Sequence, residues 1–330
     1  MDGNLTLKTL YVPGPDDRLF LRIADAIGPD SDLSSTNDRT SSDDVMKKAA
    51  VSEVLVLGPG AESASLLSCG ERHIKFVQFT SCHQSPEITA SLQADGKLVV
   101  NAGPTIAPFV AEQTMELIGE AIKLSGGKAS LNNRVIGVIG LGNVGIEVAR
   151  RVHRAGGRIV YHDIRTVQQG FAAQVGARRQ SLDRLLLDSD IVTIHVSDTP
   201  HTPALIGERE FKLIKRGSIL VNNSMANAID ETAMVRALES GKLSAAGLGV
   251  VQTLPDSRQN PLLNNPMVIT ELQKATEKDA TSDAIAALVA NNIKRFKDGS
   301  TPTGLIEIIE FPNVGDPAFW SSHLAPRQTS

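Results

Sequence analysis

The stretch that decides the fold is VIGVIGLGNVGIEVARRVHRAGGRIVYHD, residues 135–163. It reads as a buried apolar strand, a glycine-rich turn, a helix and a second strand that ends at Asp163. Gly140, Gly142 and Gly145 have the spacing G-x-G-x-x-G. The spacing alone is weak evidence, but a strand before it and a helix after it are the context that a dinucleotide-binding loop requires.

Each glycine of this loop has a separate physical purpose. Gly140 permits the tight turn, Gly142 lets a pyrophosphate approach the backbone, and Gly145 lets helix and strand pack closely. The helix N-terminus then offers unpaired N–H groups to the phosphates. Asp163 would bind the ribose hydroxyls and repel a 2′-phosphate, which favours NAD over NADP, although neighbouring Arg165 weakens that discrimination. The alternative is a glycine-rich turn without a ligand.

Length and composition set the broad class. The 330 residues are too many for one ordinary core and suit two domains. The chain is 41% hydrophobic and 21% charged, and its net charge of −4 gives no reason to expect nucleic acid or a membrane as a partner. The cysteines, Cys69 and Cys82, imply no disulfide framework. With neither a secretory signal nor a membrane span in the sequence, we expect a cytoplasmic protein.

Strand and helix patterns alternate along both halves of the chain. We expect strands at residues 7–12, 53–58, 74–79, 97–100, 134–142, 158–163, 190–196, 217–222 and 267–270. We expect helices at residues 17–27, 42–50 with Ser42 as N-cap, 107–124, 145–155, 181–189, 209–215, 231–241 and 279–299. Residues 28–44 are polar and predict a solvated loop. The alternation predicts an α/β protein with two doubly wound parallel sheets.

The chain resembles the D-isomer-specific 2-hydroxyacid dehydrogenases, the group that includes phosphoglycerate and D-lactate dehydrogenases. The sequence Val110-Ala111-Glu112 is similar to a signature of that family, as are GVIGLGNVG and the run LLLDSDIVTIHVSDTPHTPALIGEREFKLIKRGSILVN, residues 185–222. The resemblance implies a flavodoxin-like substrate domain at residues 1–104 plus 277–330 and an NAD-binding Rossmann domain at residues 105–276. It also implies a ligand cleft between the two domains and a homodimer formed through the NAD-binding domain.

The same resemblance implies which residues contact NAD. They belong to the glycine loop and to the ends of the strands around it: Gly140, Gly142, Asn143, Val144, Gly145, Asp163, Ile164, His195, Val196, Thr202, Asn223 and Ser224. No metal site is predicted.

The catalytic positions depart from the family pattern. Working members use an Arg to hold the substrate carboxylate and a His, tuned by a Glu, as acid/base. In VNNSMANAID, residues 221–230, the Arg position holds Met225. In GLGVVQTLP and ITELQKAT, Leu254 takes the Glu position, Gly249 an Asp position near the nicotinamide amide, and Glu271 the His position. Methionine cannot make a bidentate contact to a carboxylate, so the ordinary mechanism is disfavoured.

Other groups are candidates to replace this chemistry. In FTSCHQS, residues 79–85, His83 is a candidate acid/base and Cys82 a candidate nucleophile, and the alternative is a packed thiol beside a polar loop histidine. Glu271 is a candidate base if its pKa is raised, and the alternative is an ion pair with Lys274. His323, in the C-terminal tail, is a candidate lid residue, with a frayed terminus as the alternative.

Three functional hypotheses therefore stay open. The first is an NAD-dependent oxidoreductase with relocated catalytic groups and a non-standard substrate. The second is a pseudoenzyme that binds NAD(H) as a sensor, scaffold or partner subunit, and the lost carboxylate at Gly249 favours it slightly. The third is a non-redox lyase or isomerase. With Met225, Val251 and Leu254 around it, the substrate site is apolar, which favours a neutral or larger apolar ligand.

Overall fold

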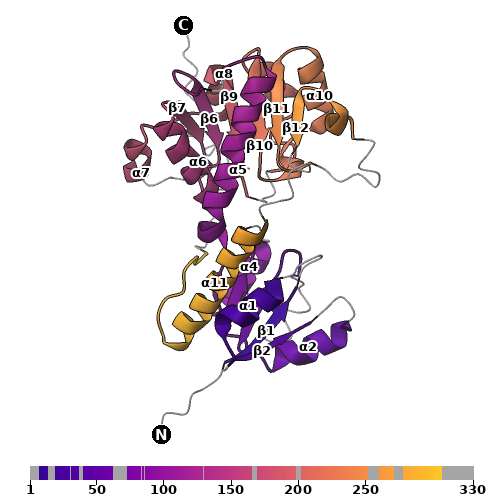
Figure 1. The fold of residues 1–330 in the computed structure, drawn as a ribbon, viewed down its shortest axis with the longest axis vertical. Coiled ribbons are helices and arrows are strands. Elements are labelled where there is room, and N and C mark those ends of the chain that lie inside the picture. Colours follow the sequence, from indigo (N-terminus) through magenta and orange to yellow (C-terminus); the bar gives the residue numbers. More distant parts are fainter. Residues whose placement is uncertain are drawn as a thin grey trace. The chain divides into compact units, whose positions relative to one another are not determined.

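The computed structural model describes residues 7–13, 19–29, 31–36, 40–61, 73–82, 84, 86–128, 130–165, 169–197, 202–251, 260–270 and 278–306. The chain divides into two compact units. Unit 1 comprises residues 1–106 and 276–308, and unit 2 comprises residues 107–275 and 309–330. Each unit contains its own parallel sheet with helices packed on it, which confirms the predicted fold class (Figure 1).

Unit 1 has a five-stranded sheet of flavodoxin-like topology. Its strands are β1 Lys8–Val12, β2 Asp32–Ser35, β3 Val54–Leu57, β4 Phe76–Phe79 and β5 Leu98–Val100. They are all parallel and lie in the order β2-β1-β3-β4-β5, which is a common doubly wound order. Its helices are α1 Leu19–Ile27, α2 Ser42–Ala50, α4 Pro86–Ala94 and α11 Lys278–Lys297. Strands β3 and β4 are fully buried, as their continuous apolar runs require.

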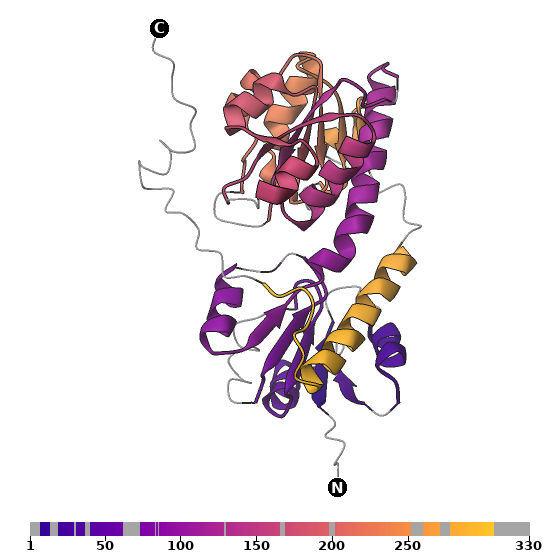
Figure 2. The same cartoon turned by 90° about the vertical axis from the view of Figure 1, so that its left-hand side faces the viewer.

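The last helix of the chain completes the core of unit 1. Ile285, Val289 and Ile293 of α11 share one apolar cluster with Tyr11 and Phe76. Figure 2 shows α11, in yellow, beside the sheet of unit 1. A chain segment that is distant in sequence therefore closes this core.

Two expectations for unit 1 are wrong. Residues 28–44 contain strand β2, which pairs in parallel with β1 through registers such as Leu33 opposite Thr9. The strand escaped prediction because Asp32–Ser35 is polar, and as an edge strand it is held by backbone bonds more than by burial. The N-cap of α2 is Ser41, whose Oγ accepts a hydrogen bond from the Asp44 N–H at 3.2 Å, and Ser42 is already helical.

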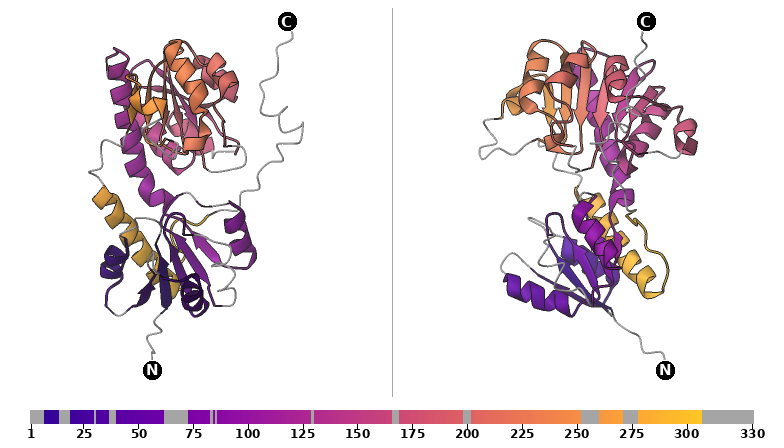
Figure 3. Two further views of the ribbon diagram at one scale, coloured as in Figure 1. Left: turned by 90° about the vertical axis from the view of Figure 1, so that its right-hand side faces the viewer. Right: turned by 180° about the vertical axis from the view of Figure 1, so that it is seen from behind.

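Unit 2 has a seven-stranded parallel sheet of Rossmann topology. Its strands are β6 Val135–Ile139, β7 Arg158–His162, β8 Arg178–Arg179, β9 Ile191–Ile194, β10 Ser218–Asn222, β11 Leu243–Leu248 and β12 Val268–Thr270. Their order is β12-β11-β10-β9-β6-β7-β8, so the direction of winding reverses between β6 and β9. This reversal is the topological switch point at which such sheets bind dinucleotides. Figure 3 shows the strands side by side, magenta to orange.

Helices cover the sheet of unit 2 on its two faces. They are α5 Gly103–Leu124, whose residues from Ala107 onward belong to this unit, α6 Asn143–Arg154, α7 Gln169–Gln174, α8 Leu182–Asp188, α9 Glu208–Leu213 and α10 Glu231–Glu239. Two short 3-10 helices are Ala226–Ala228 and Pro261–Asn264. No helix in the described part of the chain has both the length and the apolar character needed to cross a membrane.

Strands β8 and β11 were not expected. Strand β8 is two exposed arginines at the sheet edge, which carry no apolar pattern. Strand β11 has the sequence LSAAGL, whose small residues suit a close helix. A Cβ on Gly247 would lie 3.1 Å from Cβ of Leu117 on α5, so the helix packs almost directly on this strand.

Candidate functional site

Gly140 occupies the switch point of the unit 2 sheet. Its φ of 87° is left-handed, and it follows β6 directly. Its N–H donates to the His162 carbonyl at 2.8 Å, and an added Cβ would lie under 3.0 Å from the carbonyl carbon and oxygen of His195. Both the backbone conformation and the close approach of the β9 end therefore require glycine here.

Gly145 and Gly142 differ in what surrounds them. A Cβ on Gly145 would clash with the Gly140 carbonyl oxygen, so its absence lets α6 pack on the loop. Gly142 is the N-cap of α6 and supplies no side-chain cap. A Cβ there would meet only Nη2 of Arg165, at 3.3 Å, which is the mobile end of a long side chain. Packing thus explains Gly140 and Gly145, whereas Gly142 leaves open surface beside an uncapped helix N-terminus.

Asp163 lies at the end of β7, beside the glycine loop, and is only 5% exposed. Its Oδ2 accepts from the Leu141 N–H at 2.7 Å and its Oδ1 from the Arg165 N–H at 2.8 Å. The Arg179 guanidinium donates to the Asp163 carbonyl oxygen at 2.9 Å. Oδ1 also lies 3.5 Å from Nε of Arg165. A carboxylate oxygen has two lone pairs, so it is Oδ2, which accepts one hydrogen bond, that retains capacity for a ligand hydroxyl.

His195 follows β9 and is buried as a neutral imidazole. Burial lowers its pKa to about 3. The backbone N–H of His195 donates to the Ile139 carbonyl at 2.7 Å, and the ring Nε2 lies 2.8 Å from the Thr193 hydroxyl. Nδ1 is buried with no hydrogen-bond partner among the described residues. A neutral ring with an unsatisfied nitrogen suits a contact with a bound molecule rather than proton transfer at neutral pH.

The loop after β9 is closed by Thr202. This residue is buried, and its hydroxyl donates to the Ser197 carbonyl at 2.7 Å. Val196 packs against the core of unit 2. Both residues therefore lie on the segment that follows β9, and the contact with NAD that the resemblance implies for them stays a prediction.

The stretch VNNSMANAID forms a self-stabilised turn after β10. Asn222 organises it: Oδ1 accepts from N–H and Oγ of Ser224 at 3.1 and 2.9 Å, and Nδ2 donates to the Met225 carbonyl at 2.9 Å. Asn223 reaches across to α5, where its Nδ2 lies 3.4 Å from the Val110 carbonyl. The turn is thus held by amides, and Asn222 and Asn223 contribute no charge to it.

Met225 is part of the apolar packing of unit 2. It is half-buried and packs, together with Val251, against the cluster that contains Leu248 and Ile206. Met225 therefore makes a hydrophobic contact at the position where the resemblance predicts an Arg in working members. Leu254 and Glu271, for which the resemblance also predicts substitutions, lie outside the described residues, as do His83, Lys274 and His323. Their proposed roles therefore stay predictions.

Cys82 lies in unit 1 and packs against its core. Burial raises the pKa of its thiol to about 11, so the group is protonated at neutral pH. Because the thiolate is the reactive form of cysteine, the raised pKa of Cys82 disfavours its proposed role as a nucleophile. Among the described residues no group of three His, Cys, Asp or Glu side chains is arranged to hold a metal ion.

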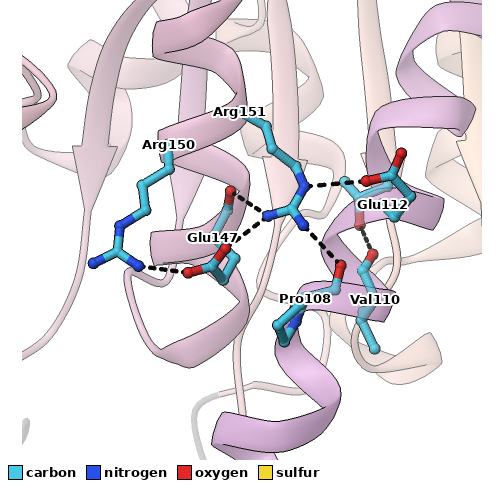
Figure 4. Close-up of polar contacts among 7 residues, drawn as sticks. Pro108, Val110, Glu112, Glu147, Arg150 and Arg151 are labelled. Carbon is cyan, nitrogen blue, oxygen red and sulfur yellow. Dashed lines mark hydrogen bonds and ion pairs between the residues drawn. The ribbon is translucent and has the colours of Figure 1, made fainter. Parts of the chain in front are cut away.

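Arg151 on α6 ties that helix to α5 (Figure 4). Its guanidinium donates to the Pro108 carbonyl at 3.1 Å, to the Glu112 carboxylate at 3.3 Å and to the Glu147 carboxylate at 2.7 Å. Burial raises the pKa of Glu147, but the hydrogen bonds from Arg151 and Arg150 outweigh it and leave that pKa below its ordinary value. No sequence motif predicts the contacts of this clamp with α5, although the Glu147–Arg151 spacing of four residues indicates a helix ion pair.

Comparison with known proteins agrees with this geometry. Residues 113–271 match the model of the family described as D-isomer specific 2-hydroxyacid dehydrogenase, NAD binding domain. The chain is 36% identical over 187 residues to a glyoxylate reductase of Korarchaeum cryptofilum, which is 56% of this chain and 55% of the relative. It is 35% identical over 169 residues to a D-3-phosphoglycerate dehydrogenase of Archaeoglobus fulgidus, or 51% of this chain and 32% of the relative.

Similarity to solved structures extends over both units. A D-lactate dehydrogenase of Aquifex aeolicus, complexed with NAD and lactic acid, superposes with a TM-score of 0.70 at 23% identity and covers 88% of this chain and 96% of that one. At this identity the match shows the fold alone. The sequence alignments cover 55% of the length of the glyoxylate reductase and 32% of the length of the D-3-phosphoglycerate dehydrogenase.

Proposed function

Since the chain belongs, through its NAD-binding domain at residues 113–271, to the D-isomer specific 2-hydroxyacid dehydrogenase family, we propose that it is an NAD(H)-dependent oxidoreductase with a non-standard carbonyl substrate. The observation that carries the proposal is the set of groups around the glycine loop. Gly142 leaves the α6 N-terminus open. Asp163 keeps acceptor capacity beside it, and Nδ1 of His195 is buried and unsatisfied among the described residues.

These groups fit the parts of a dinucleotide. The α6 N-terminus suits the pyrophosphate, because it presents N–H groups and partial positive charge. The Asp163 carboxylate suits the vicinal hydroxyls of a ribose. NAD, when bound, would accept or deliver the hydride, and the chain's own residues would orient it and exclude water.

The substrate class follows from Met225. A 2-oxo acid loses its usual ionic anchor when the guanidinium is replaced by a thioether, whereas a neutral or bulkier apolar carbonyl compound gains a contact surface. Val251 adds to that apolar surface. We therefore propose reduction of a neutral, apolar carbonyl compound, with Glu271 or His83 as the group that supplies the proton.

Binding and turnover are tested separately. NADH binding is followed by its fluorescence on titration with the wild-type protein, with Asp163→Ala, and with Glu239→Gln as an exposed control on the same unit. We expect Asp163→Ala to weaken binding at least ~10-fold and Glu239→Gln to leave it unchanged. NADH oxidation is then measured with glyoxylate, pyruvate and phenylglyoxylate, and with uncharged aldehydes and ketones.

The outcomes separate the competing functions. Oxidation with uncharged carbonyls above that with 2-oxo acids supports the proposal. NADH binding without any turnover would instead indicate a sensor, scaffold or partner subunit. No binding of NADH or NAD would reject both redox hypotheses and leave a non-redox enzyme. We also propose a homodimer in a reducing, cytoplasmic setting, which light scattering of the purified protein tests for the oligomeric state.

A further inference from the structure

The ends of β10 and β11 fit together through an unusual pair, Asn223 and Gly249. The Gly249 N–H donates to the Asn222 carbonyl at 2.9 Å, which brings the two chain segments side by side. A Cβ on Gly249 would lie under 3.0 Å from both Oδ1 and Cγ of Asn223. The Asn223 side chain therefore occupies the room that any side chain at position 249 would need.

The amide of Asn223 has a defined orientation. Its nitrogen lies 3.4 Å from the Val110 carbonyl oxygen and 3.4 Å from the Thr114 hydroxyl. The carbonyl can only accept, and the hydroxyl already donates its proton to that same carbonyl at 2.7 Å. Both neighbours thus call for a donor, which places Nδ2 toward α5 and Oδ1 toward Gly249.

Oδ1 of Asn223 is left as an available acceptor. Among the described residues it accepts no hydrogen bond, and Asn223 is half-buried rather than sealed in the core. An amide oxygen with two lone pairs, held by an anchored NH₂ group, is a rigid acceptor at a partly accessible strand end.

The position of this acceptor relates it to one half of a dinucleotide. In a doubly wound sheet the two nucleotides lie on either side of the switch point, here between β6 and β9. Asp163 after β7 marks the ribose on the adenosine side. The ends of β10 and β11 are on the other side, where the second nucleotide and its nicotinamide base would lie when NAD is bound. That base carries a primary carboxamide whose NH₂ group needs an acceptor.

We propose that Oδ1 of Asn223, standing in the room left by the missing side chain of Gly249, receives the carboxamide NH₂ of the nicotinamide ring and so fixes the orientation of that ring. Asn223 is a cofactor-positioning residue in this proposal, which rests on the NAD(H) binding proposed above. No side chain is then needed at position 249 after β11, because Asn223 after the neighbouring strand β10 supplies the acceptor.

The test compares three ligands that differ only at the nicotinamide. NADH carries the carboxamide, reduced 3-acetylpyridine adenine dinucleotide replaces its NH₂ by methyl, and ADP-ribose lacks the ring. Dissociation constants are measured by calorimetry for the wild type, Asn223→Ala and Gly249→Ala. Asn132→Ala, an exposed asparagine of unit 2, is the matched control.

We expect the wild type and Asn132→Ala to bind NADH ~5–10-fold more tightly than the acetylpyridine analogue, which is the contribution of one hydrogen bond. Asn223→Ala and Gly249→Ala should reduce this preference to about one, with ADP-ribose affinity changed less than ~2-fold. In Gly249→Ala the loss arises because the new methyl group displaces the amide.

Each failure has a distinct meaning. The inference is overturned if Asn223→Ala keeps the wild-type preference for NADH over the acetylpyridine analogue, or if it loses NADH and ADP-ribose affinity equally. It is also overturned if the wild type shows no such preference. If the wild type binds neither NADH nor ADP-ribose, the proposed function fails with it. Because the ligands are compared within one variant, partial unfolding cancels from the ratio.

Discussion

Oδ2 of Asp163 accepts a hydrogen bond from the backbone N–H of Leu141 at 2.7 Å, which joins the end of β7 to the glycine loop after β6. Its Oδ1 accepts from the Arg165 N–H on the other side. One buried carboxylate therefore shapes the loop and, in the proposed function, binds the ribose. The effect of Asp163 on stability and its effect on NADH binding can be measured separately.

Asp163→Asn tests both roles at once. An amide has one oxygen, so its NH₂ group must face one of the two backbone N–H donors and leave it unsatisfied. We expect a loss of ~1–3 kcal/mol in the free energy of unfolding and weaker NADH binding, with NADPH discriminated against less than before. Urea unfolding and fluorescence titration measure these effects. Asp183→Asn, at a partly exposed carboxylate paired with Arg209, is the control, and a fully stable Asp163→Asn would contradict the structural role.

Much of unit 2 followed from its sequence because local residue types and tertiary structure agree there. The apolar run of β6, the three glycines and the acid after β7 each match their local surroundings. The structure places the glycine loop at the switch point and bonds Asp163 to it. The strands that the sequence did not predict, β2, β8 and β11, are polar, very short or rich in small residues. Their strand character comes from pairing with neighbours.

The candidate site was predictable to a lesser degree. Gly142 and Asp163 are motif positions that any reader of the sequence finds. The Leu141 N–H contact with Asp163, the fit of Asn223 against Gly249 and the unsatisfied Nδ1 of His195 depend on segments far apart in the chain. No local pattern encodes such contacts, because they arise only when strand ends meet.

The three glycines of the loop should respond differently to alanine. In Gly140→Ala the left-handed φ and the clash with His195 add up to ~3 kcal/mol or more of destabilisation. Gly145→Ala meets the Gly140 carbonyl and should cost ~2 kcal/mol or more. Gly142→Ala displaces only the end of Arg165 and should cost about 1 kcal/mol, from its poorer N-cap. Thermal or urea unfolding gives this ranking.

Ligand binding supplies the contrast for this series. Gly142→Ala places a methyl group on the open surface beside the α6 N-terminus, so we expect NADH and ADP-ribose affinity to fall ~10-fold or more in a folded protein. Equal stability losses for Gly142→Ala and Gly145→Ala would mean that Gly142 is required by packing, which the structure contradicts.

Arg151 should matter more to stability than its neighbour Arg150. Arg151 joins α6 to α5 through Pro108 and Glu112 and is only 20% exposed, whereas the 44%-exposed Arg150 bonds Glu147 and lies over the Phe171 ring at 5.3 Å. We expect Arg151→Met to lower the free energy of unfolding by ~1–3 kcal/mol and Arg150→Met by less than ~1 kcal/mol. Urea unfolding of both variants checks the order, and the reverse order would refute the clamp.

Buried His195 should make stability depend on pH below neutrality. Its folded pKa of about 3 lies below the ordinary value near 6.5, so between these values the unfolded chain binds a proton that the folded chain does not. Stability should therefore fall by up to ~1.4 kcal/mol per pH unit from about pH 6.5 downward, and level off near the folded pKa.

The variant His195→Gln isolates this effect. It removes the titrating ring, so the slope of unfolding free energy between about pH 6 and pH 5 should decrease by about 1 kcal/mol per unit. His153→Gln, an exposed histidine on α6, should retain the wild-type slope. The depressed pKa values of Glu147 and Asp190, where burial raises the pKa and hydrogen bonds from Arg151 and Lys215 outweigh it, act at lower pH. Identical slopes in wild type and His195→Gln would show that His195 is not buried neutral.

Introducing the ionic groups that the resemblance predicts for a working site tests the proposed substitution at Met225. Met225→Arg alone supplies an anchor for a carboxylate, but hydride transfer to a 2-oxo acid also needs a proton donor and its tuning carboxylate. We therefore expect Met225→Arg with Glu271→His to remain inactive toward glyoxylate, and activity to appear only when Leu254→Glu is added. The Arg should also cost ~1–2 kcal/mol of stability, because Met225 packs against the core of unit 2. NADH oxidation with glyoxylate is compared across the series, and clear turnover by the double variant would show that position 254 is dispensable.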